Sequence, residues 1–316
     1  MSFCIEYLDY YIPRKKVLSR RVLENKDIDS EQFINDTGIN TINVFEQYEL
    51  PDALDNMFDK MFKSQNIELS KIKYIACETT PLTKYHNISV VHFLQKKYGM
   101  DKAKIIPLHQ PCAFALCAME LSTKLLEQDE YMVILCANDW SERELGERFL
   151  KFTIMGDGIG LVLVKNDVEE KSSIRIHDWY YENYGVSSFT TYNTKNYESE
   201  PVLNRLSMIK KGVDFITRSL KQSNKSITDI DKIIVSNVRH DVFRDTYSGL
   251  LGVSSNVFYL ENTQEGGHVN DIDVIRNLKD YLEKKHGEDN KEVIALYTLD
   301  IEESMDINYH LIILNI

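Results

Sequence analysis

Cys112 carries the strongest signal for chemistry in this sequence. It follows Pro111 and opens the run CAFALCAMELSTKLLEQ, which is apolar over two turns and then amphipathic, the pattern of a buried helix. Proline is tolerated at a helix start, and a thiol in the first turn lies at the positive end of the helix dipole, which favours the thiolate. A thiolate can accept an acyl group from a thioester and pass it on in a second step. Cys112 is therefore a candidate nucleophile, and a buried structural cysteine is the alternative.

The other four cysteines are interpreted as structural. Cys4, Cys77, Cys117 and Cys136 lie mostly in apolar runs, and no pair has the CxxC spacing of a metal or redox site. Free thiols of this kind indicate a reducing, cytoplasmic compartment and no structural metal. The N-terminus shows no signal-peptide pattern, and no window reaches the apolar length of a membrane span.

Length and charge set the class of protein. The 316 residues, 43% of them hydrophobic, predict two domains or one large layered unit. The net charge of −12 disfavours nucleic acid and anionic membranes as partners.

The chain contains an internal repeat. Three short buried strands in the first half recur in the same order 150 to 160 residues later: KIKYIACE and DKIIVSN, YMVILCAND and EVIALYTLD, GLVLVKN and HLIILNI. Helical segments separate these strands, so each sheet must be covered on both faces. The repeat predicts two similar halves, 1–170 and 171–316, stacked as α/β/α/β/α layers. The stretch from about 171 to 205, which is rich in tyrosine, is predicted to be a strand plus a long insertion that lines a site.

Four motifs on this frame resemble one family. DTGIN (36–40), ETTP (78–81), HQPCAFALCAMEL (109–121) and MGDGIGLVLV (155–164) resemble, in order, the motifs of the ketoacyl-ACP synthase III branch of the thiolase superfamily. The resemblance runs from about Thr37 to the end. It favours Cys112 as a nucleophile over a buried structural cysteine. It implies the internally duplicated, five-layered thiolase fold, a homodimer, and a CoA or acyl carrier protein thioester as substrate without a further cofactor. The glycine motif at 156–160 is interpreted as structural support for the site.

The resemblance also indicates the base. Ordinary synthases of this family have a histidine after a strand of the second half and an asparagine further on; here Asn237 and His268 occupy those places in exchanged order. A branch with an aspartate five residues after the histidine, here Asp273, transfers acyl groups to oxygen or nitrogen nucleophiles. Asp271 is a rival for Asp273, and His240 would be the base if the strand register differed.

The exchanged positions of Asn237 and His268 indicate which reaction the site would catalyse. Decarboxylative condensation needs hydrogen-bond donors at a carbonyl so that an enolate forms, whereas transfer to an alcohol or amine needs a base near neutral pH. A histidine oriented by a carboxylate fits the second task, so Cys112, His268 and Asp273 are predicted to act as a triad. Asn237 is then expected to donate its amide to the oxyanion.

Glu78 supports a second interpretation. The related hydroxymethylglutaryl-CoA synthases use a glutamate base near this strand end, so Glu78 is a possible base for an enolising or hydroxyl-bearing partner. A strand-end glutamate that faces solvent or a dimer partner is the alternative.

The residues expected to bind the thioester donor differ from those of the family. Relatives that use CoA have arginines just after the T-G-I turn, and this chain has Asn40 to Asn43 there, which favours a carrier-protein donor. Arg239 and Arg244 are candidates for a basic docking patch, together with Lys210 and Lys211. The C-terminal stretch ESMDINYH lacks the glycines of the family's loop.

Together these observations predict an acyltransferase that passes an acyl group from a thioester through Cys112 to a hydroxyl or amine acceptor. A carbon–carbon bond-forming synthase and a catalytically degenerate partner subunit are the alternatives.

Overall fold

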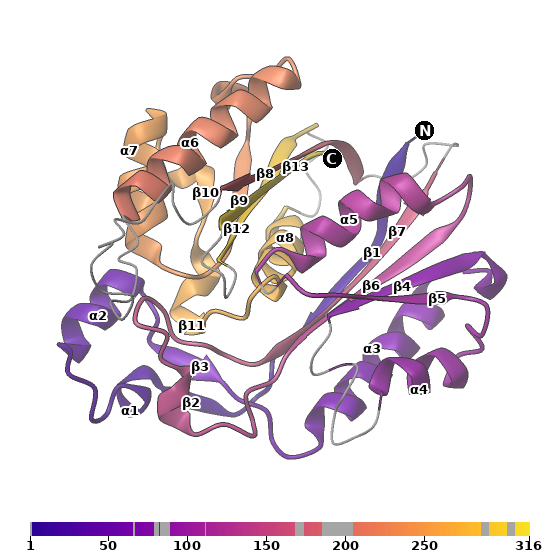
Figure 1. The fold of residues 1–316 in the computed structure, drawn as a ribbon, viewed down its shortest axis with the longest axis horizontal. Coiled ribbons are helices and arrows are strands. Elements are labelled where there is room, and N and C mark those ends of the chain that lie inside the picture. Colours follow the sequence, from indigo (N-terminus) through magenta and orange to yellow (C-terminus); the bar gives the residue numbers. More distant parts are fainter. Residues whose placement is uncertain are drawn as a thin grey trace, which may run out of the picture.

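The computed structural model describes residues 2–65, 67–78, 82, 89–110, 112–167, 174–184, 205–285, 291–301 and 307–316. Ten of the described strands form one mixed sheet in the order β10-β9-β12-β13-β8-β1-β7-β6-β4-β5 (Figure 1). One half of the sheet consists of β1 (Phe3–Tyr11), β4 (Ile72–Glu78), β5 (Lys104–Leu108), β6 (Tyr131–Asn138) and β7 (Gly158–Asn166). The other consists of β8 (Arg175–Tyr184), β9 (Lys232–Val235), β10 (Phe258–Tyr259), β12 (Val293–Ile301) and β13 (Ile307–Asn315).

The two halves of this sheet have the same topology. In the first, β4 pairs in parallel with β5 and β6, and β7 pairs antiparallel with β6 and β1. In the second, β9 pairs in parallel with β10 and β12, and β13 pairs antiparallel with β12 and β8. The three predicted strand pairs, β4 with β9, β6 with β12 and β7 with β13, therefore take equivalent places, and the predicted duplication is confirmed. The predicted boundary after residue 170 lies outside the described residues.

Helices α5 (Phe114–Leu125) and α8 (Ile272–Lys284) form the middle layer (Figure 1). Their apolar side chains share one core with strands of both halves, including Ile134 of β6 and Leu296 of β12. Both helices are buried over their first two turns, where they meet sheet residues on both sides. This explains why the first two turns of α5 are apolar almost all round.

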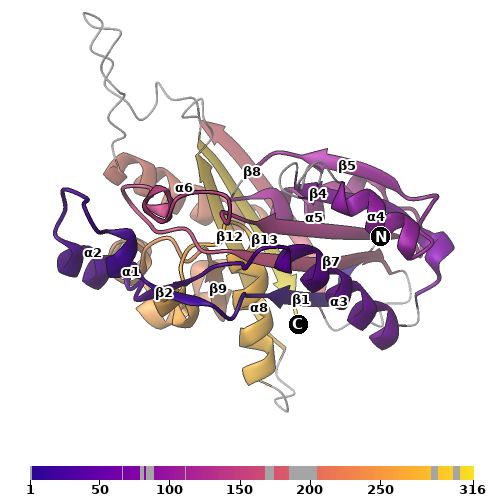
Figure 2. The ribbon, with the colours of Figure 1, turned by 90° about the horizontal axis from the view of Figure 1, so that it is seen from below.

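Outer helices complete the five layers. Helices α3 (Glu49–Ser64) and α4 (Val90–Lys97) pack on the outer face of the first half, and α6 (Arg205–Gln222), η5 (Val242–Tyr247) and α7 (Ser248–Leu251) pack on the second. Figure 2 shows α3 and α4 at the opposite end of the molecule from α6. Strand β7 shows the two-residue period of a strand covered on both faces: Leu161 and Leu163 face the outer core, and Val162 and Val164 face the middle layer. The predicted α/β/α/β/α layering is thus confirmed.

A small second sheet holds the loop before α8. Strands β2 (Lys16–Leu18), β3 (Thr41–Asn43) and β11 (Glu265–Gly266) pair in the order β11-β3-β2, and the short helices α1 (Ser19–Val22) and α2 (Ser30–Thr37) pack beside them. Helix α2 is capped by Asp29 and ends at Gly38, whose φ of 76° is left-handed. The pairing of β11 with β3 fixes the chain two residues before His268.

Shorter helical turns connect these elements: η1 (Leu69–Lys71), η2 (Leu145–Arg148), η4 (Ile227–Asp229), η6 (Ser255–Val257) and η7 (Glu261–Gln264). Within the described ranges, no helix combines the length and the apolar character that a membrane crossing would need. The tyrosine-rich insertion was predicted from 171 onward; β8 confirms its strand, and residues 185–204 lie outside the described chain.

Candidate active site

Cys112 lies in a tight turn between β5 and α5. The N–H groups of Ala113 and Phe114 both donate to the Gln110 carbonyl oxygen, at 3.1 Å and 2.8 Å. Ala113 has a non-helical φ of −134°, so α5 begins at Phe114, two residues later than predicted. The thiol of Cys112 therefore lies just ahead of the helix and not in its first turn, and it is partly exposed.

His268 reaches the same point from the loop before α8. Its backbone is clamped on both sides: its N–H donates to the Ile154 carbonyl oxygen at 2.9 Å, and its carbonyl oxygen accepts from the Gly156 N–H at 2.9 Å. The two preceding glycines, Gly266 and Gly267, have φ values of 107° and 75°, which other residues rarely adopt. The side chain of His268 is almost completely buried.

The structure brings three of the predicted site residues into contact. His268 Nε2 lies 3.5 Å from Cys112 Sγ, and His268 Nδ1 lies 2.6 Å from Asp273 Oδ2. Because Asp273 can only accept when ionised, Nδ1 carries the ring proton and Nε2 presents its lone pair to the thiol. The thiol proton therefore has an acceptor in the imidazole, which is the arrangement that an activated cysteine requires.

Asp273 is held by three further donors. The backbone N–H of Asn237 donates to Oδ2 at 2.8 Å, and the side-chain amide of Asn237 and the N–H of Val269 donate to Oδ1 at 3.1 Å each. The Asn237 side-chain oxygen accepts from Asn277 Nδ2 at 3.0 Å. The side-chain amide of Asn237, which the sequence predicts to face an oxyanion, thus donates to Asp273 in the structure.

Sequence reasoning missed Asn270 and Asn138. Asn270 Oδ1 lies 3.7 Å from Cys112 Sγ, within reach of the thiol proton, and Asn270 Nδ2 donates to Asn138 Oδ1 at 3.0 Å. Asn138 is oriented by Trp140 Nε1, which donates to the same oxygen at 3.0 Å, and by its own amide, which donates to the Gly156 carbonyl oxygen at 2.6 Å. A polar residue at the end of the buried strand β6 was a usable signal for Asn138; nothing in the sequence indicated Asn270.

Buried carboxyl groups surround the cysteine. Burial raises the pKa of the Cys112 thiol well above its ordinary value, and the nearby carboxyls of Asp300, Asp271, Asp273 and Glu78 raise it further. The effect expected from the helix dipole is therefore outweighed, because burial and four acidic neighbours both disfavour the thiolate. Burial and these carboxyls therefore favour the neutral thiol of Cys112 over the thiolate.

Glu78 and Asp271 belong to this acidic surrounding. Burial raises the pKa of Glu78 well above its ordinary value, with Asp271 acting in the same direction. Burial also raises the pKa of Asp271 to about 7. Asp271 Oδ2 accepts from the Ala115 N–H at 3.1 Å, so this rival of Asp273 contacts the start of α5 and leaves His268 to Asp273.

The glycine motif supports the histidine loop. A Cβ atom at Gly156 would stand 1.8 Å from the Gly266 carbonyl oxygen, so only glycine lets the two segments approach. Asp157 accepts from the N–H groups of Phe45 and Trp140, at 2.8 Å and 2.9 Å, and forms a buried two-pronged ion pair with Arg148. These contacts agree with the structural role predicted for the motif.

Arg239 and Arg244 are both paired with carboxylates. Arg239 lies 2.7 Å from Asp241 and 3.4 Å from Asp36, and its side chain is 16% exposed. Arg244 lies 2.6 Å from Asp245 and is 47% exposed. His240, the alternative base, contacts Arg244. Of the two arginines, Arg244 is the more accessible to a docking partner.

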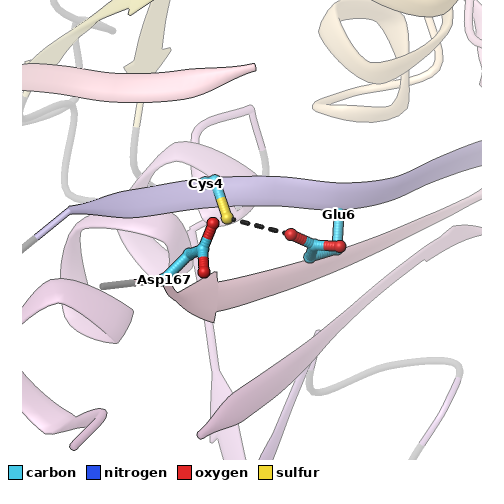
Figure 3. A group of neighbouring side chains, drawn as sticks. All are labelled: Cys4, Glu6 and Asp167. Carbon is cyan, nitrogen blue, oxygen red and sulfur yellow. Dashed lines mark hydrogen bonds between the residues drawn. The ribbon is translucent and has the colours of Figure 1, made fainter. Parts of the chain in front are cut away.

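Among the described residues, one set of three side chains could hold a metal ion, and none of the three is near Cys112 in the sequence. Cys4 and Glu6 of β1 and Asp167, just after β7, face one another (Figure 3). The Cys4 thiol donates to Glu6 at 3.2 Å, and Lys165 Nζ lies 3.1 Å from Asp167. Because the lysine already supplies positive charge there, this set carries no metal assignment.

Comparison with known proteins gives the fold a context. No family model matches the chain, and no curated protein matches its sequence. Solved structures match along the whole chain: ChlB3, an acyltransferase, at a TM-score of 0.78 and 12% identity over 99% of this chain and 97% of the other. The 3-oxoacyl-[acyl-carrier-protein] synthase III of Aquifex aeolicus VF5 matches at 0.73 and 12%, covering 98% and 99%. A variant of OleA from Xanthomonas campestris matches at 0.75 and 14%, covering 99% and 98%. The chain has the thiolase fold of ketoacyl synthase III-type proteins, as the sequence predicted.

Proposed function

We propose that this chain is a thioester-dependent acyltransferase that carries the acyl group on Cys112 and passes it to a hydroxyl or amine acceptor. The observation that carries the proposal is the line of contacts from Cys112 Sγ through His268 to Asp273, at 3.5 Å and 2.6 Å. The similarity in fold to an acyltransferase and to synthases supports an enzyme that handles acyl thioesters.

The first half-reaction acylates the cysteine. His268 Nε2 takes the thiol proton as Cys112 Sγ attacks the thioester carbonyl carbon, and Asp273 stabilises the imidazolium through Nδ1–H. The tetrahedral intermediate collapses by breaking the bond between the carbonyl carbon and the donor's sulfur. That sulfur takes the proton from His268, and the free thiol leaves.

The second half-reaction uses the same base. The acceptor loses a proton to His268 Nε2 and attacks the acyl carbon, and Cys112 Sγ leaves with that proton. A high thiol pKa suits this cycle, because the Cys112 thiol keeps its proton until the attack on the donor and regains one when it leaves the acyl group.

The donor is proposed to be an acyl carrier protein or CoA thioester. Within the predicted basic patch, Lys210 is exposed, and so is Arg244. The pairing of Arg244 with Asp245 limits its attraction for an acidic carrier, since a docking carboxylate must compete with an existing partner.

A condensing enzyme is the second candidate function, and Glu78 is the observation in its favour. The carboxyl of Glu78 is buried, 6% exposed, and close enough to Cys112 to raise the pKa of its thiol. A carboxylate there can take a proton from the α-carbon of a second thioester.

Intact-mass measurement tests the acyl-enzyme. Wild type, Cys112→Ala and the matched control Cys117→Ala are each incubated with acyl-CoA and acyl-carrier thioesters of several chain lengths. We expect one acyl mass on the wild type and on Cys117→Ala, and none on Cys112→Ala. No gain with any donor would contradict the proposal and favour a partner-subunit role.

A further inference from the structure

Among the described residues, two side chains lie within hydrogen-bonding reach of the Cys112 thiol, and both present acceptors to it. His268 Nε2 lies 3.5 Å from Sγ and presents a lone pair, because the other ring nitrogen donates to Asp273. Asn270 Oδ1 lies 3.7 Å from Sγ. A thiol has one proton, so even in the free enzyme it can satisfy one of these two acceptors at a time.

The orientation of the Asn270 amide is fixed by its neighbours. Asn138 donates through Nδ2 to the Gly156 carbonyl oxygen at 2.6 Å, so its Oδ1 points to Asn270 and must accept from Asn270 Nδ2, at 3.0 Å. Trp140 Nε1 donates to the same Asn138 oxygen at 3.0 Å. Rotating the Asn270 amide by half a turn would oppose two carbonyl oxygens, so Oδ1 stays toward the sulfur.

Acylation leaves both acceptors without a donor. The acylated sulfur has no proton, so His268 Nε2 and Asn270 Oδ1 both require hydrogens from the incoming acceptor molecule. An alcohol offers one O–H. A primary amine offers two N–H groups while its lone pair points at the acyl carbon, so it matches both acceptors at once.

The buried carboxyl groups near Cys112 also favour an amine as the acceptor. Asp271 and Glu78 are buried, 0% and 6% exposed, and within the described chain Asp271 Oδ1 and Glu78 Oε2 have no hydrogen-bond partner. Buried carboxyl oxygens without donors favour a cationic or donor-rich ligand and disfavour an anionic one such as a malonyl thioester. Water also has two O–H groups, but it has no charge to match these carboxyls.

We infer that the acceptor for acyl-Cys112 is a primary amine, whose two N–H groups bind His268 Nε2 and Asn270 Oδ1; this inference rests on the function proposed above. The amine arrives as an ammonium ion and loses one proton to solvent. Its nitrogen then forms the bond to the acyl carbon and gives a second proton to His268, which passes it to the departing Cys112 sulfur. The product is an amide that keeps the third hydrogen.

The test separates the two half-reactions. The enzyme is acylated, freed of excess donor, and mixed with butylamine, 1-butanol, a malonyl thioester or buffer alone, while the loss of acyl mass and the product are followed. We expect butylamine to discharge wild type faster than butanol or buffer and to yield the amide. Asn270→Gly, which keeps the backbone allowed at its φ of 50°, should lower the amine-to-alcohol rate ratio roughly tenfold, the effect of one lost hydrogen bond.

A matched control exists in Asn224→Gly. Asn224 also has a left-handed φ, of 56°, in the turn after α6, so its replacement repeats the backbone change outside the site. Its rate ratio should equal that of wild type. Comparing ratios between variants removes the intrinsic difference in nucleophilicity between amines and alcohols, and the acylation rate shows that each variant is folded.

Each outcome has one meaning. An acyl-enzyme that discharges to butanol, buffer or a malonyl thioester at least as fast as to butylamine would overturn the amine inference and leave acyl-Cys112 standing. An unchanged amine-to-alcohol rate ratio in Asn270→Gly would show that Asn270 does not bind the amine. Failure to form any acyl-enzyme would instead refute the proposed function.

Discussion

Asn237 donates both its backbone N–H and its side-chain amide to Asp273, at 2.8 Å and 3.1 Å. Asp273 in turn holds His268 at 2.6 Å. Asn237, two residues after β9, therefore holds the carboxylate that holds His268, the base of the proposed reaction.

This order of contacts predicts graded effects on acylation of Cys112. Asp273→Asn should slow it by roughly 10² to 10⁴-fold, because the imidazole loses the partner that sets its tautomer. Asn237→Ala removes one of four donors to Asp273 and should slow it by about tenfold. Rapid-quench mass measurement gives both rates. Glu283→Gln, an exposed change on α8, is the control and should leave the acylation rate unchanged. Equal rate losses in Asn237→Ala and Asp273→Asn would contradict the proposal that Asn237 acts through Asp273.

Gly156→Ala should displace the histidine loop. The added methyl group would meet the Gly266 carbonyl oxygen at 1.8 Å, so one segment must move, at a cost of about 1–3 kcal/mol. We expect lower stability in urea and slower acylation together. Gly249→Ala in α7 meets nothing within 4 Å among the described residues and should leave both unchanged or raise stability slightly. A fully active Gly156→Ala enzyme would show that the close approach does not position His268.

Arg148→Met should be strongly destabilising. Arg148 and Asp157 are 3% and 0% exposed, and the methionine would leave Asp157 as an uncompensated buried charge, at a cost of about 3–5 kcal/mol. Urea unfolding measures the loss. The exposed pair of Arg244 and Asp245 gives the contrast, since solvent screens this pair and Arg244→Gln should reduce stability far less than Arg148→Met. Similar losses of unfolding free energy in Arg148→Met and Arg244→Gln would show that burial of the ion pair does not cause the destabilisation.

Asp271 predicts a pH dependence of stability. Its pKa is raised by burial to about 7 in the folded protein, from about 4 in an unfolded chain. The folded state thus binds this proton more tightly, so the stability it contributes is complete below about pH 4 and is lost as the pH rises through 7. Asp271→Asn keeps an acceptor for the Ala115 N–H and removes this loss.

The free energy of unfolding of Asp271→Asn relative to wild type should therefore increase between pH 5 and 7, by at most about 1.4 kcal/mol for each pH unit. Urea unfolding at several pH values measures it. Asp214→Asn, an exposed change on α6, should show no such trend. A difference that stays constant, or that shrinks as the pH rises, would contradict the assignment.

The fold was predictable because the spacing of apolar residues along the sequence indicates the strands and helices. Strands β4, β6 and β7 and their counterparts β9, β12 and β13 are short continuous apolar runs, and such runs must be covered on both faces whatever their neighbours. The apolar sequence of α5 likewise requires the middle layer.

The site was predictable where a local pattern carried it. Cys112 and the pair His268 and Asp273 stand in recognisable motifs, and the structure brings them into contact. The contacts of Asn237 were not predictable, because its partner Asp273 lies 36 residues away and only the packing of β9 against α8 joins them. The same holds for Asn270, whose orientation depends on Asn138 from a different strand. The raised pKa of the Cys112 thiol depends on carboxyl groups from three separate segments: Glu78 of β4, Asp271 and Asp273 at the start of α8, and Asp300 of β12.

The most direct test locates the acyl group itself. Wild-type protein is mixed with an acyl-CoA or acyl-carrier thioester, quenched in acid within the first turnover, digested and analysed by peptide mass spectrometry. The account predicts the acyl group on the peptide that contains Cys112, with Cys4, Cys77, Cys117 and Cys136 unmodified, and much slower labelling in His268→Gln. An acyl group on any other residue, or labelling of Cys112 at an unchanged rate without His268, would contradict it.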